Sequence, residues 1–599
     1  MKLAYVCKYT PVEILEAMGF DTELIEPDVV GFTAAETAMH PNMCSYVKGV
    51  MEKLKEADYD GVILTTCCDS MRRLKDVAKH NYPNMKIYSL DLPRKLGETG
   101  ESLYFDRVNN LINELSRDFA VEFEEDRFLY HLKNNCANNK EKNKDYGHNL
   151  EGTQIEIGIL GGRIGTNSIE SIINNGFETK FNLTCTGDVN NQQLFENIGS
   201  LREYTNEKMR QFPCMRMDQG EKRRKLIEKE IETVDGLIYH NVQFCDMYSY
   251  EYTSLRKSID KPILRLDTDL TPQSKGQIKT RVEAFYESLE GKLNCDYRQI
   301  CQSENENIRR RKLEEEFYQE KREKRTLHMQ GGITENKQKV YVLGIDSGST
   351  STNAVIMDEN GELIASSSVR TGAKASEGAK KAFEDVLDKA KLNEKDISRI
   401  VSTGYGRDNI KFKDRSVTEI TCHGRGAHYF FPQAVTVLDI GGQDSKAIKL
   451  DRDGNVVDFA MNDKCAAGTG RFLEAIARTL EIPVTSLEKE ASKSKNKIEI
   501  SSMCTVFAES EVISLIAEDV DVSDIAAGVS NSIAGKAIAL MKRIGLEEPY
   551  MMTGGVARNG AVVKALSEIS GGDFLIPENP DLAGAVGAAL FAIDDVKII

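Results

Sequence analysis

Two cysteines, Cys465 and Cys504, occupy positions in this sequence that point directly to chemistry. They stand 39 positions apart, and each precedes an apolar pattern with the period of a helix. A thiolate at a helix N-terminus is stabilised by the macrodipole and by free backbone N–H groups, which favours its metal-binding form. Two thiolates do not complete a four-cysteine iron–sulfur site within one chain. A two-fold dimer would supply the other two; the alternative is a pair of buried, reduced cysteines.

Six further cysteines fall at similar places of an internal repeat. Residues 60–64 and 235–239 match, and each strand leads to a Cys-Asp pair, Cys68-Asp69 or Cys245-Asp246, which favours Cys68 over Cys67. Two facing copies would gather six thiols: Cys7, Cys44, Cys68, Cys185, Cys214 and Cys245. Six thiolates exceed the need of one cubane, and they suit two fused clusters that share a bridging atom. The alternative is that each fills the core. Three cysteines without a repeat partner are interpreted as structural: Cys136, Cys295 and Cys301.

Three turns rich in glycine or hydroxyl residues follow apolar strands in the C-terminal part. The first begins at Asp346, the second at Asp439, and the third contains Gly554 and Gly555. Backbone N–H groups and hydroxyls in such turns hold phosphates without a P-loop lysine. A carboxylate at a strand end holds Mg²⁺ through water. The three turns predict an ATP and Mg²⁺ site formed by Asp346, Gly348, Ser349, Thr350, Thr352, Asp439, Gly441, Gly442, Gln443, Gly554 and Gly555.

Strands that alternate with helices must position these groups, so the fold class is α/β. The internal repeat predicts two Rossmann-like lobes, at residues 1–150 and 151–300. Functional groups in such lobes gather where parallel strands end. Residues 301–338 are highly charged and are interpreted as a helical linker. Residues 339–599 form the predicted ATPase domain.

Composition excludes several classes of function. The chain has 599 residues and a formal net charge of -16, which argues against a nucleic-acid or anionic-membrane partner. No apolar run is long enough to cross a membrane, and residues 1–15 do not form a signal-peptide core. Of thirteen cysteines, ten precede Lys339 and three follow it, and reduced thiols used for metal or redox work are expected. The predicted location is the cytoplasm of an anaerobic cell.

Residues 340–599 resemble the ATP-dependent activators of 2-hydroxyacyl-CoA dehydratases and benzoyl-CoA reductases. The resemblance is carried by IDSGSTSTNAVIM, VLDIGGQDSK, NDKCAAGTGRFLE, CTVFAESE and MTGGVARN. It implies an actin, sugar-kinase and heat-shock type ATPase fold and a homodimer with one [4Fe-4S] cluster held by Cys465 and Cys504 of each subunit. ATP hydrolysis would change the angle between the cluster-bearing helices and lower the cluster potential. The segment TEITCHGRGA resembles a family segment near the subunit interface or the nucleotide, and Cys422 within it is not an expected ligand.

Residues 1–300 are similar to the dehydratase small-subunit family. The similar pieces are CKYTP, MCSYVK, CDSMRRL, LDLPR, PCM and QFCDMYSYE. Typical dehydratase subunits hold a single cubane with three cysteines. The six matched cysteines resemble more closely the double-cubane cluster proteins, whose [8Fe-9S] cluster has six cysteine ligands. Cys185 differs from Cys7 in its place in the repeat.

These resemblances imply an ATP-driven iron–sulfur reductase that acts on small molecules. Ferredoxin or flavodoxin would donate the electrons, Asp439 would take part in ATP hydrolysis, and Gln443 would orient the attacking water. One alternative is a 2-hydroxyacyl-CoA dehydratase or benzoyl-CoA reductase type enzyme fused to its activator. Another is a metal-free ATPase that serves as a sensor or chaperone. Comparing turnover of acyl-CoA thioesters with that of acetylene or hydrazine tests the first alternative. Counting iron and sulfide tests the second.

Overall fold

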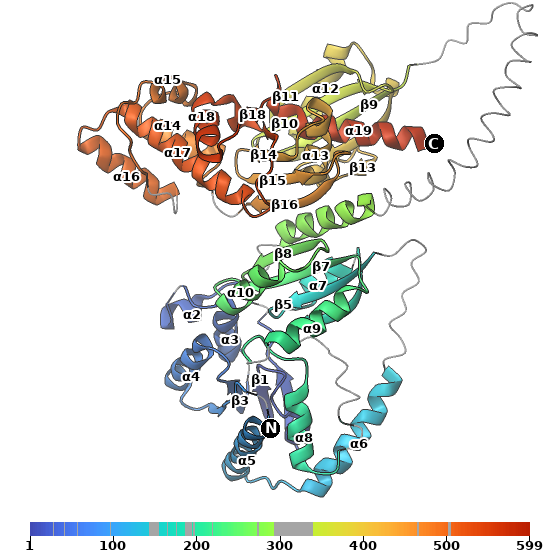
Figure 1. The fold of residues 1–599 in the computed structure, drawn as a ribbon, viewed down its shortest axis with the longest axis vertical. Coiled ribbons are helices and arrows are strands. Elements are labelled where there is room, and N and C mark those ends of the chain that lie inside the picture. The colour runs from blue at the N-terminus through green and yellow to red at the C-terminus, as the bar shows by residue number, and fades with distance from the viewer. Residues whose placement is uncertain are drawn as a thin grey trace, which may run out of the picture. The chain divides into compact units, whose positions relative to one another are not determined.

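The computed structural model describes the chain except for residues 28, 41, 57, 96, 143–154, 165, 175, 186–194, 196–197, 218–219, 272–274, 293–338, 464–465, 501–504 and 599. Cys465, Cys504 and the predicted linker at 301–338 lie outside the described residues. The chain divides into two compact units, Met1–Leu289 and Glu290–Ile599, called unit 1 and unit 2 (Figure 1). No helix in the described part is long and apolar enough to cross a membrane. The boundaries of the four predicted domains stay a prediction.

Unit 1 begins with a parallel sheet whose central strand β3 is buried along its whole length. Such a run, GVILT, is typical of a strand with helices on both faces. The strand order is β2 (Asp21–Leu24), β1 (Lys2–Tyr5), β3 (Gly61–Thr65), β4 (Lys86–Leu90). The accompanying helices are α1 (Val12–Ala17), α2 (Thr33–Ala38), α3 (Ser45–Glu56), α4 (Asp69–Asn81) and α5 (Glu98–Phe119).

A second parallel sheet in unit 1 repeats the strand order of the first. Its order is β6 (Glu178–Thr184), β5 (Glu156–Gly161), β7 (Gly236–Val242), β8 (Ile263–Thr268). The helices are α6 (Glu125–Lys142), α7 (Thr166–Asn174), α8 (Leu201–Arg210), α9 (Gly220–Ile231) and α10 (Asp246–Leu255). Helices α5 and α8 lie side by side, and Tyr104 and Tyr204 on them belong to one hydrophobic core. The prediction of two Rossmann-like lobes is confirmed.

Unit 2 contains two five-stranded sheets with the same topology. The first has the order β11 (Leu363–Arg370), β10 (Ser351–Asp358), β9 (Tyr341–Ser347), β12 (Ile397–Thr403), β13 (Arg415–Ser416). The second has the order β16 (Val456–Asn462), β15 (Ser445–Leu450), β14 (Thr436–Ile440), β17 (Tyr550–Thr553), β18 (Phe574–Leu575). In both sheets the first three strands in chain order are antiparallel and the last two are parallel to the first. This duplication confirms the predicted actin and sugar-kinase type fold.

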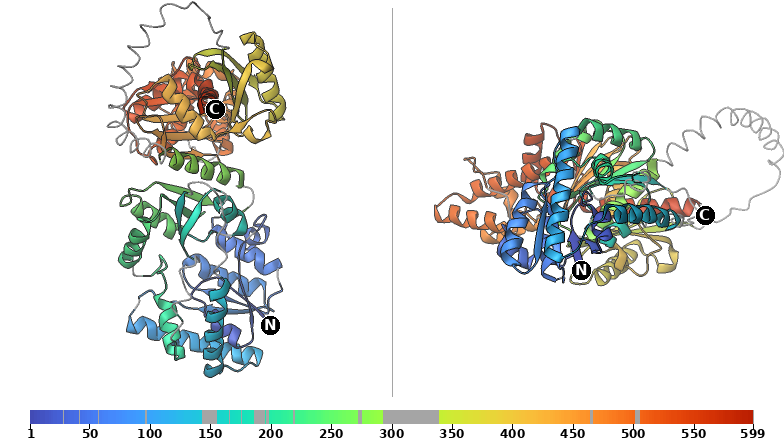
Figure 2. Two further views of the ribbon diagram at one scale, coloured as in Figure 1. Left: turned by 90° about the vertical axis from the view of Figure 1, so that its right-hand side faces the viewer. Right: turned by 90° about the horizontal axis from the view of Figure 1, so that it is seen from below.

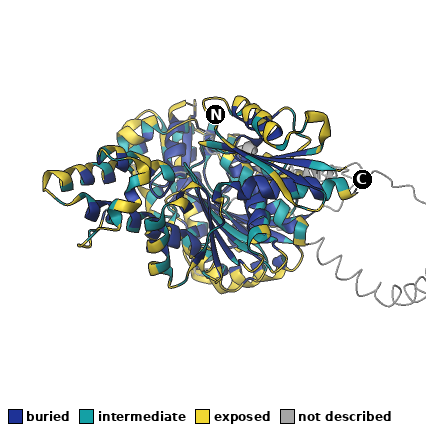
Figure 3. Cartoon of the chain, turned by 90° about the horizontal axis from the view of Figure 1, so that it is seen from above, coloured by how far each residue is buried: buried dark blue, intermediate teal, exposed yellow. Residues whose placement is uncertain are grey.

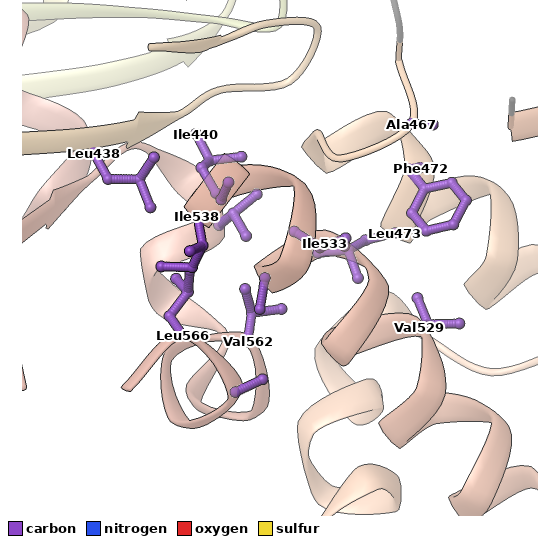
Figure 4. Packing of buried hydrophobic residues seen from close by; sticks show 14 of the residues in the cluster. Leu438, Ile440, Ala467, Phe472, Leu473, Val529, Ile533, Ile538, Val562 and Leu566 are labelled. Atoms are coloured by element: carbon purple, nitrogen blue, oxygen red, sulfur yellow. The ribbon is translucent and has the colours of Figure 1, made fainter. Parts of the chain in front are cut away.

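The helices of unit 2 pack around these sheets, as two further views show (Figure 2). They are α12 (Ala375–Ala390), α13 (Glu419–Phe430), α14 (Gly470–Thr479), α15 (Leu487–Ala491), α16 (Thr505–Ala517), α17 (Val522–Met541), α18 (Gly560–Ser570) and α19 (Ala583–Ile598). One hydrophobic core joins Leu438 and Ile440 of β14 to α14, α17 and α18 (Figure 4). Buried residues follow the sheets, and exposed residues lie on the outer helix faces (Figure 3).

Helices α13 and α19 approach each other closely because glycines face the contact. A Cβ on Gly426 would lie 1.9 Å from the carbonyl oxygen of Ala583, and a Cβ on Gly587 would lie 1.9 Å from that of Cys422. Neither position tolerates a side chain without a backbone shift. The contact buries Cys422 in an apolar core with residues of the first sheet, and α13 also packs against β14, β15 and β16 of the second sheet.

Candidate functional site

The carboxyl ends of β9 and β14 each carry a buried aspartate. Asp346 lies in β9 opposite Thr403 of β12, and Asp439 lies in β14 opposite Thr553 of β17. Thr553 donates a 2.9 Å hydrogen bond from Oγ1 to Oδ1 of Asp439. The duplicated topology therefore places two equivalent carboxylates at equivalent strand ends, as the sequence predicted for the phosphate turns.

His423 on α13 links the two aspartates. Its Nε2 lies 3.6 Å from Oδ2 of Asp346, and its Nδ1 lies 3.4 Å from Oδ1 of Asp439. Burial lowers the pKa of His423, but Asp439 and Asp346 raise it more, to about 9. The ring is therefore an imidazolium at neutral pH, and it offsets the repulsion between the two carboxylates.

Lys446 is a second buried cation at this site. Its Nζ lies 2.9 Å from Asp444, 3.3 Å from Asp439 and 3.7 Å from Glu419. Burial raises the pKa of Glu419 to about 7 although Lys446 opposes the shift. With Asp346 included, four carboxylates face two cations, which leaves two negative charges when all four are ionised. A divalent cation such as Mg²⁺ would balance that charge, so the residues fit the predicted ion.

The glycine turns lie against the same groups. A Cβ on Gly442 would lie 2.2 Å from Oγ1 of Thr350, so the two predicted phosphate turns touch. Gly554 has a φ of +81°, and a Cβ there would lie 2.8 Å from Oδ1 of Asp439. Buried hydroxyls of Ser347 and Thr403 at the ends of β9 and β12 have no protein partner. Such hydroxyls are available to phosphate oxygens.

Two predicted nucleotide residues are engaged elsewhere. Oγ1 of Thr352 forms a 2.9 Å hydrogen bond with Oγ1 of Thr371, so its hydroxyl joins two neighbouring segments of unit 2. When the amide of Gln443 is oriented to satisfy its neighbours, its oxygen accepts a 2.6 Å hydrogen bond from Nη2 of Arg471. The amide of Gln443 is thus held by the residue at the start of α14. Whether it also orients water stays a prediction.

Sequence reasoning did not single out three residues of this site, namely Glu419, His423 and Lys446. The signal for two of them was the segment TEITCHGRGA, which contains Glu419 and His423. Lys446 was detectable only through strand register, because β15 pairs it directly with Asp439.

The thiols of unit 1 form a second candidate site. Cys7 follows β1, Cys185 follows β6, and Cys214 lies between α8 and α9. Cys44 precedes α3, while Cys68 and Cys245 are the N-cap residues of α4 and α10. Cys185 departs from the repeat because the strand equivalent to β1 is β5, which ends at Gly161.

Electrostatic interactions divide these thiols into two linked sets. The first set comprises Cys7, Cys67, Cys185 and Cys214, and each of the first three interacts with Cys214. The second set comprises Cys44, Cys68 and Cys245. A hydrogen bond from the Cys67 thiol to Cys68 links the sets. All six predicted thiols, and Cys67 as a seventh, therefore belong to one network of electrostatic interactions. That they hold a cluster stays a prediction.

The helix-capping thiols differ from the others in their ease of ionisation. The Cys44 thiol donates to Cys245 and lowers the pKa of Cys245, and the Cys67 thiol acts on Cys68 in the same way. Backbone N–H groups at the starts of α4 and α10 also lower these two pKa values. Burial raises the pKa of Cys7 and Cys185. Cys68 and Cys245 therefore have lower thiol pKa values than Cys7, Cys44 and Cys185.

Buried polar atoms without a protein partner lie in the same segments as the thiols. Within four residues of a site cysteine they include side-chain atoms of Thr10, Ser45, Gln211, Arg216, Asn241 and Tyr248. Buried polar groups normally have partners, and the donors in this set, namely the hydroxyls, the Gln211 amide nitrogen and the Arg216 guanidinium, fit an anionic group such as a sulfide-rich cluster. Among the described residues, no three His, Cys, Asp or Glu side chains are arranged to hold a single metal ion. A cubane spreads its thiolates more widely than one ion does, because each binds a different iron.

The predicted cysteines of unit 2 fall outside the described residues, but the helices that follow them are described. Helix α14 begins five residues after Cys465, and α16 begins immediately after Cys504. The two helices lie side by side. Helix α16 exposes four large apolar side chains: Val506, Phe507, Ile513 and Ile516.

The duplicated sheets and the paired aspartates define unit 2 as an ATPase of the actin and sugar-kinase class. Residues 343–592 match the model of the BadF/BadG/BcrA/BcrD ATPase family. Residues 7–151 and 132–289 match the model of the 2-hydroxyglutaryl-CoA dehydratase D-component. The chain belongs to the BadF/BadG/BcrA/BcrD ATPase family and carries, in the same polypeptide, an N-terminal dehydratase D-component domain.

Relatives of known description match the C-terminal part almost over their whole length. The chain is 43% identical over 258 residues to the 2-hydroxyisocaproyl-CoA dehydratase activator of Clostridioides difficile, covering 43% of this chain and 97% of that protein. It is 42% identical over 254 residues to the (R)-2-hydroxyglutaryl-CoA dehydratase activating ATPase of Acidaminococcus fermentans, covering 42% and 97%. The crystal structure of component A of that dehydratase has 42% identity and a TM-score of 0.42, covering 43% of this chain and 99% of that one.

Proposed function

We propose that the chain couples ATP hydrolysis to electron transfer, from a [4Fe-4S] cluster shared by two chains to a double-cubane [8Fe-9S] cluster in unit 1, and so reduces small molecules. The single observation that carries the proposal is the gathering of seven thiols in one unit of a chain whose other unit is an activator-type ATPase. Three thiolates would serve a single cubane. Two linked sets suit a larger cluster.

The ATPase half of the proposal rests on the strand ends of unit 2. Asp346 and Asp439 would hold Mg²⁺-ATP, with the Gly441-Gly442 and Gly554-Gly555 turns against the phosphates. His423 fixes the positions of the two aspartates relative to each other, since its two ring nitrogens contact both. A relative 43% identical in sequence has been crystallised with bound ADPNP, which supports nucleotide binding here.

The reducing half rests on the thiols of unit 1. Cys7, Cys185 and Cys214 would hold one cubane, and Cys44, Cys68 and Cys245 the other, as the two electrostatic sets suggest. The N-terminal ends of α4 and α10 stabilise the Cys68 and Cys245 thiolates. When bound, such a cluster supplies single electrons at low potential, which its charge and hydrogen bonds set.

The shared cluster requires a homodimer. Cys465 and Cys504 of each chain would provide its four ligands. The exposed apolar side chains of α16, directly after Cys504, support an interface at this place. Ferredoxin or flavodoxin is the proposed donor.

Iron and sulfide counting with EPR on anaerobically purified protein tests this function. We expect about ten irons per chain, eight in unit 1 and half of a shared cubane in unit 2. Cys465→Ser should abolish ATP-coupled electron transfer and spare nucleotide binding. The matched control is Cys422→Ala, which should change neither. Iron-free protein that still hydrolyses ATP would refute the redox assignment and favour a sensor ATPase.

A second function is favoured by the names of the relatives, which activate dehydratases of 2-hydroxyacyl-CoA esters. In this case the chain would be a dehydratase or CoA-ester reductase fused to its activator, with one cubane in unit 1. Comparing turnover of acyl-CoA thioesters with that of acetylene or hydrazine decides between the two. Thioester turnover together with about six irons per chain would select the second function.

A further inference from the structure

Arg216 is a buried arginine without a carboxylate partner among the residues that the structure describes. It lies between α8 and α9, two residues after Cys214, and its relative exposure is 8%. Its Nη1 donates a 3.1 Å hydrogen bond to the carbonyl oxygen of Leu92, which follows β4. Its Nε and Nη2 are buried and have no hydrogen-bond partner. Within the described part of the chain, no carboxylate forms an ion pair with Arg216.

Three other arginines of unit 1 bind a carboxylate through the Nε–Nη2 edge of the guanidinium. Arg163 holds Glu26, Arg223 holds Glu251 and Arg265 holds Asp267, each through Nε and Nη2. In the Arg265 pair the distances to Oδ1 are 3.1 Å and 2.8 Å. The Nε–Nη2 edge forms a planar fork that matches the two oxygens of a carboxylate. In Arg216 the same two nitrogens are buried, and neither has an acceptor among the described residues.

The open fork lies in the segment that contributes to the first thiol set. Arg216 and Cys214 both act electrostatically on Tyr9, and the Tyr9 hydroxyl accepts a 3.3 Å hydrogen bond from the backbone N–H of Cys214. Gln211 in the same segment is buried, and both atoms of its amide lack a partner. Burying a guanidinium without an acceptor is costly, and the bond to Leu92 satisfies only one of its nitrogens. A bound anion would satisfy the remaining two.

We propose that the Nε–Nη2 fork of Arg216 binds the carboxylate of a small-molecule ligand beside the first thiol set. The inference rests on the proposed function only in taking that ligand to be the molecule that is reduced. Recognition of the carboxylate itself depends on Arg216 and requires no cluster. The substrate class is therefore a small carboxylate or another planar oxyanion of the same shape.

Anaerobic titration calorimetry with acetate on the full chain tests this inference, with chloride as an anion of equal charge that lacks a fork-shaped face. We expect saturable heat with acetate and none with chloride. Arg216→Gln should weaken acetate binding by about tenfold or more, since it removes a charge-assisted bidentate contact. Arg216→Lys keeps the charge and loses the fork, so it should also weaken acetate binding. Arg72→Gln removes an exposed arginine of unit 1 and should leave the affinity unchanged.

The outcomes separate this inference from the proposed function. Iron-free protein that binds acetate through Arg216 would refute the function and retain the carboxylate site. Iron-loaded protein that gives no heat with acetate, or equal affinity for acetate and chloride, would overturn the site. An unchanged acetate affinity in Arg216→Lys, with a shifted EPR spectrum, would also overturn it and would place the fork on the cluster instead.

Discussion

The two units compensate buried charge in opposite ways. In unit 2, Asp346 and Asp439 have protein cations against them, because His423 and Lys446 lie between the strand ends. In the described part of unit 1, the Nε–Nη2 fork of Arg216 has no protein acceptor, and several other buried polar atoms near the thiols also lack a partner. Both sites lie where strands end in α/β layers, so topology alone does not explain the difference.

The difference indicates how each site depends on its ligand. A site whose aspartates are already offset by buried cations can exist without nucleotide and exchange it, as an ATPase must. A site with unsatisfied buried groups is stabilised by whatever satisfies them, so it should retain its ligand. We therefore expect unit 1 to depend on its bound group for stability more strongly than unit 2 depends on its nucleotide, although the unpartnered hydroxyls of Ser347 and Thr403 also leave unit 2 groups for its ligand to satisfy.

The largest effect is expected from Asp439→Asn. This change removes the charge that Lys446 and His423 neutralise and a predicted contact to Mg²⁺. ATP hydrolysis should fall by about 100-fold or more, measured as phosphate release at saturating ATP. Asp573→Asn, at an exposed aspartate, is the control and should retain wild-type turnover. Full activity in Asp439→Asn would remove this strand end from the mechanism.

The next largest effect distinguishes the adjacent thiols Cys68 and Cys67. Cys68→Ser should lose about four irons per chain, because one cubane would lack a ligand. Cys67→Ser should retain them, since its thiol donates to Cys68 and is not a predicted ligand. Iron analysis of the two variants gives the comparison. Equal losses would show that the seventh thiol is itself a ligand.

Removal of iron should lower the melting temperature of unit 1 by several degrees and leave that of unit 2 unchanged. Scanning calorimetry before and after anaerobic chelation measures both transitions. The Cys465→Ser, Cys504→Ser double variant is the appropriate background, because it removes the predicted ligands from unit 2. A lower melting temperature of unit 2 alone would show that unit 2, and not unit 1, depends on iron for its stability.

The smallest effect concerns pH and His423. Its pKa is about 9 in the folded protein and its ordinary value is 6.5, so its stabilising contribution is complete below about pH 6.5 and lost as pH rises through 9. The loss amounts to at most about 3.5 kcal/mol at about 1.4 kcal/mol per pKa unit. Nucleotide-free unit 2 should therefore melt at a lower temperature at pH 9.5 than at pH 6.5. His423→Gln should flatten this slope, and His428→Gln, on the same helix, should not.

Short sequence patterns were enough to predict the strands and turns that carry the candidate site residues. The run GVILT predicted a buried strand, and β3 spans Gly61–Thr65. The turn residues at 359–361 join β10 to β11 as an antiparallel hairpin. Apolar runs and turn residues act over a few positions, so their effect is visible in one segment. Cys214 lies farther from the next helix than Cys68 or Cys245 does, since α9 begins only at Gly220.

The partners of those residues were not visible in the sequence. His423 reaches Asp346 and Asp439 because glycines let α13 approach α19, and Lys446 reaches Asp439 through the pairing of β14 with β15. The unpartnered fork of Arg216 can be recognised only from the tertiary contacts of the described residues around it. The sequence by itself determined the fold class, the repeat, the family and the candidate thiols and turns. Tertiary structure decided how charge is compensated around them, since that depends on contacts between residues far apart in the chain.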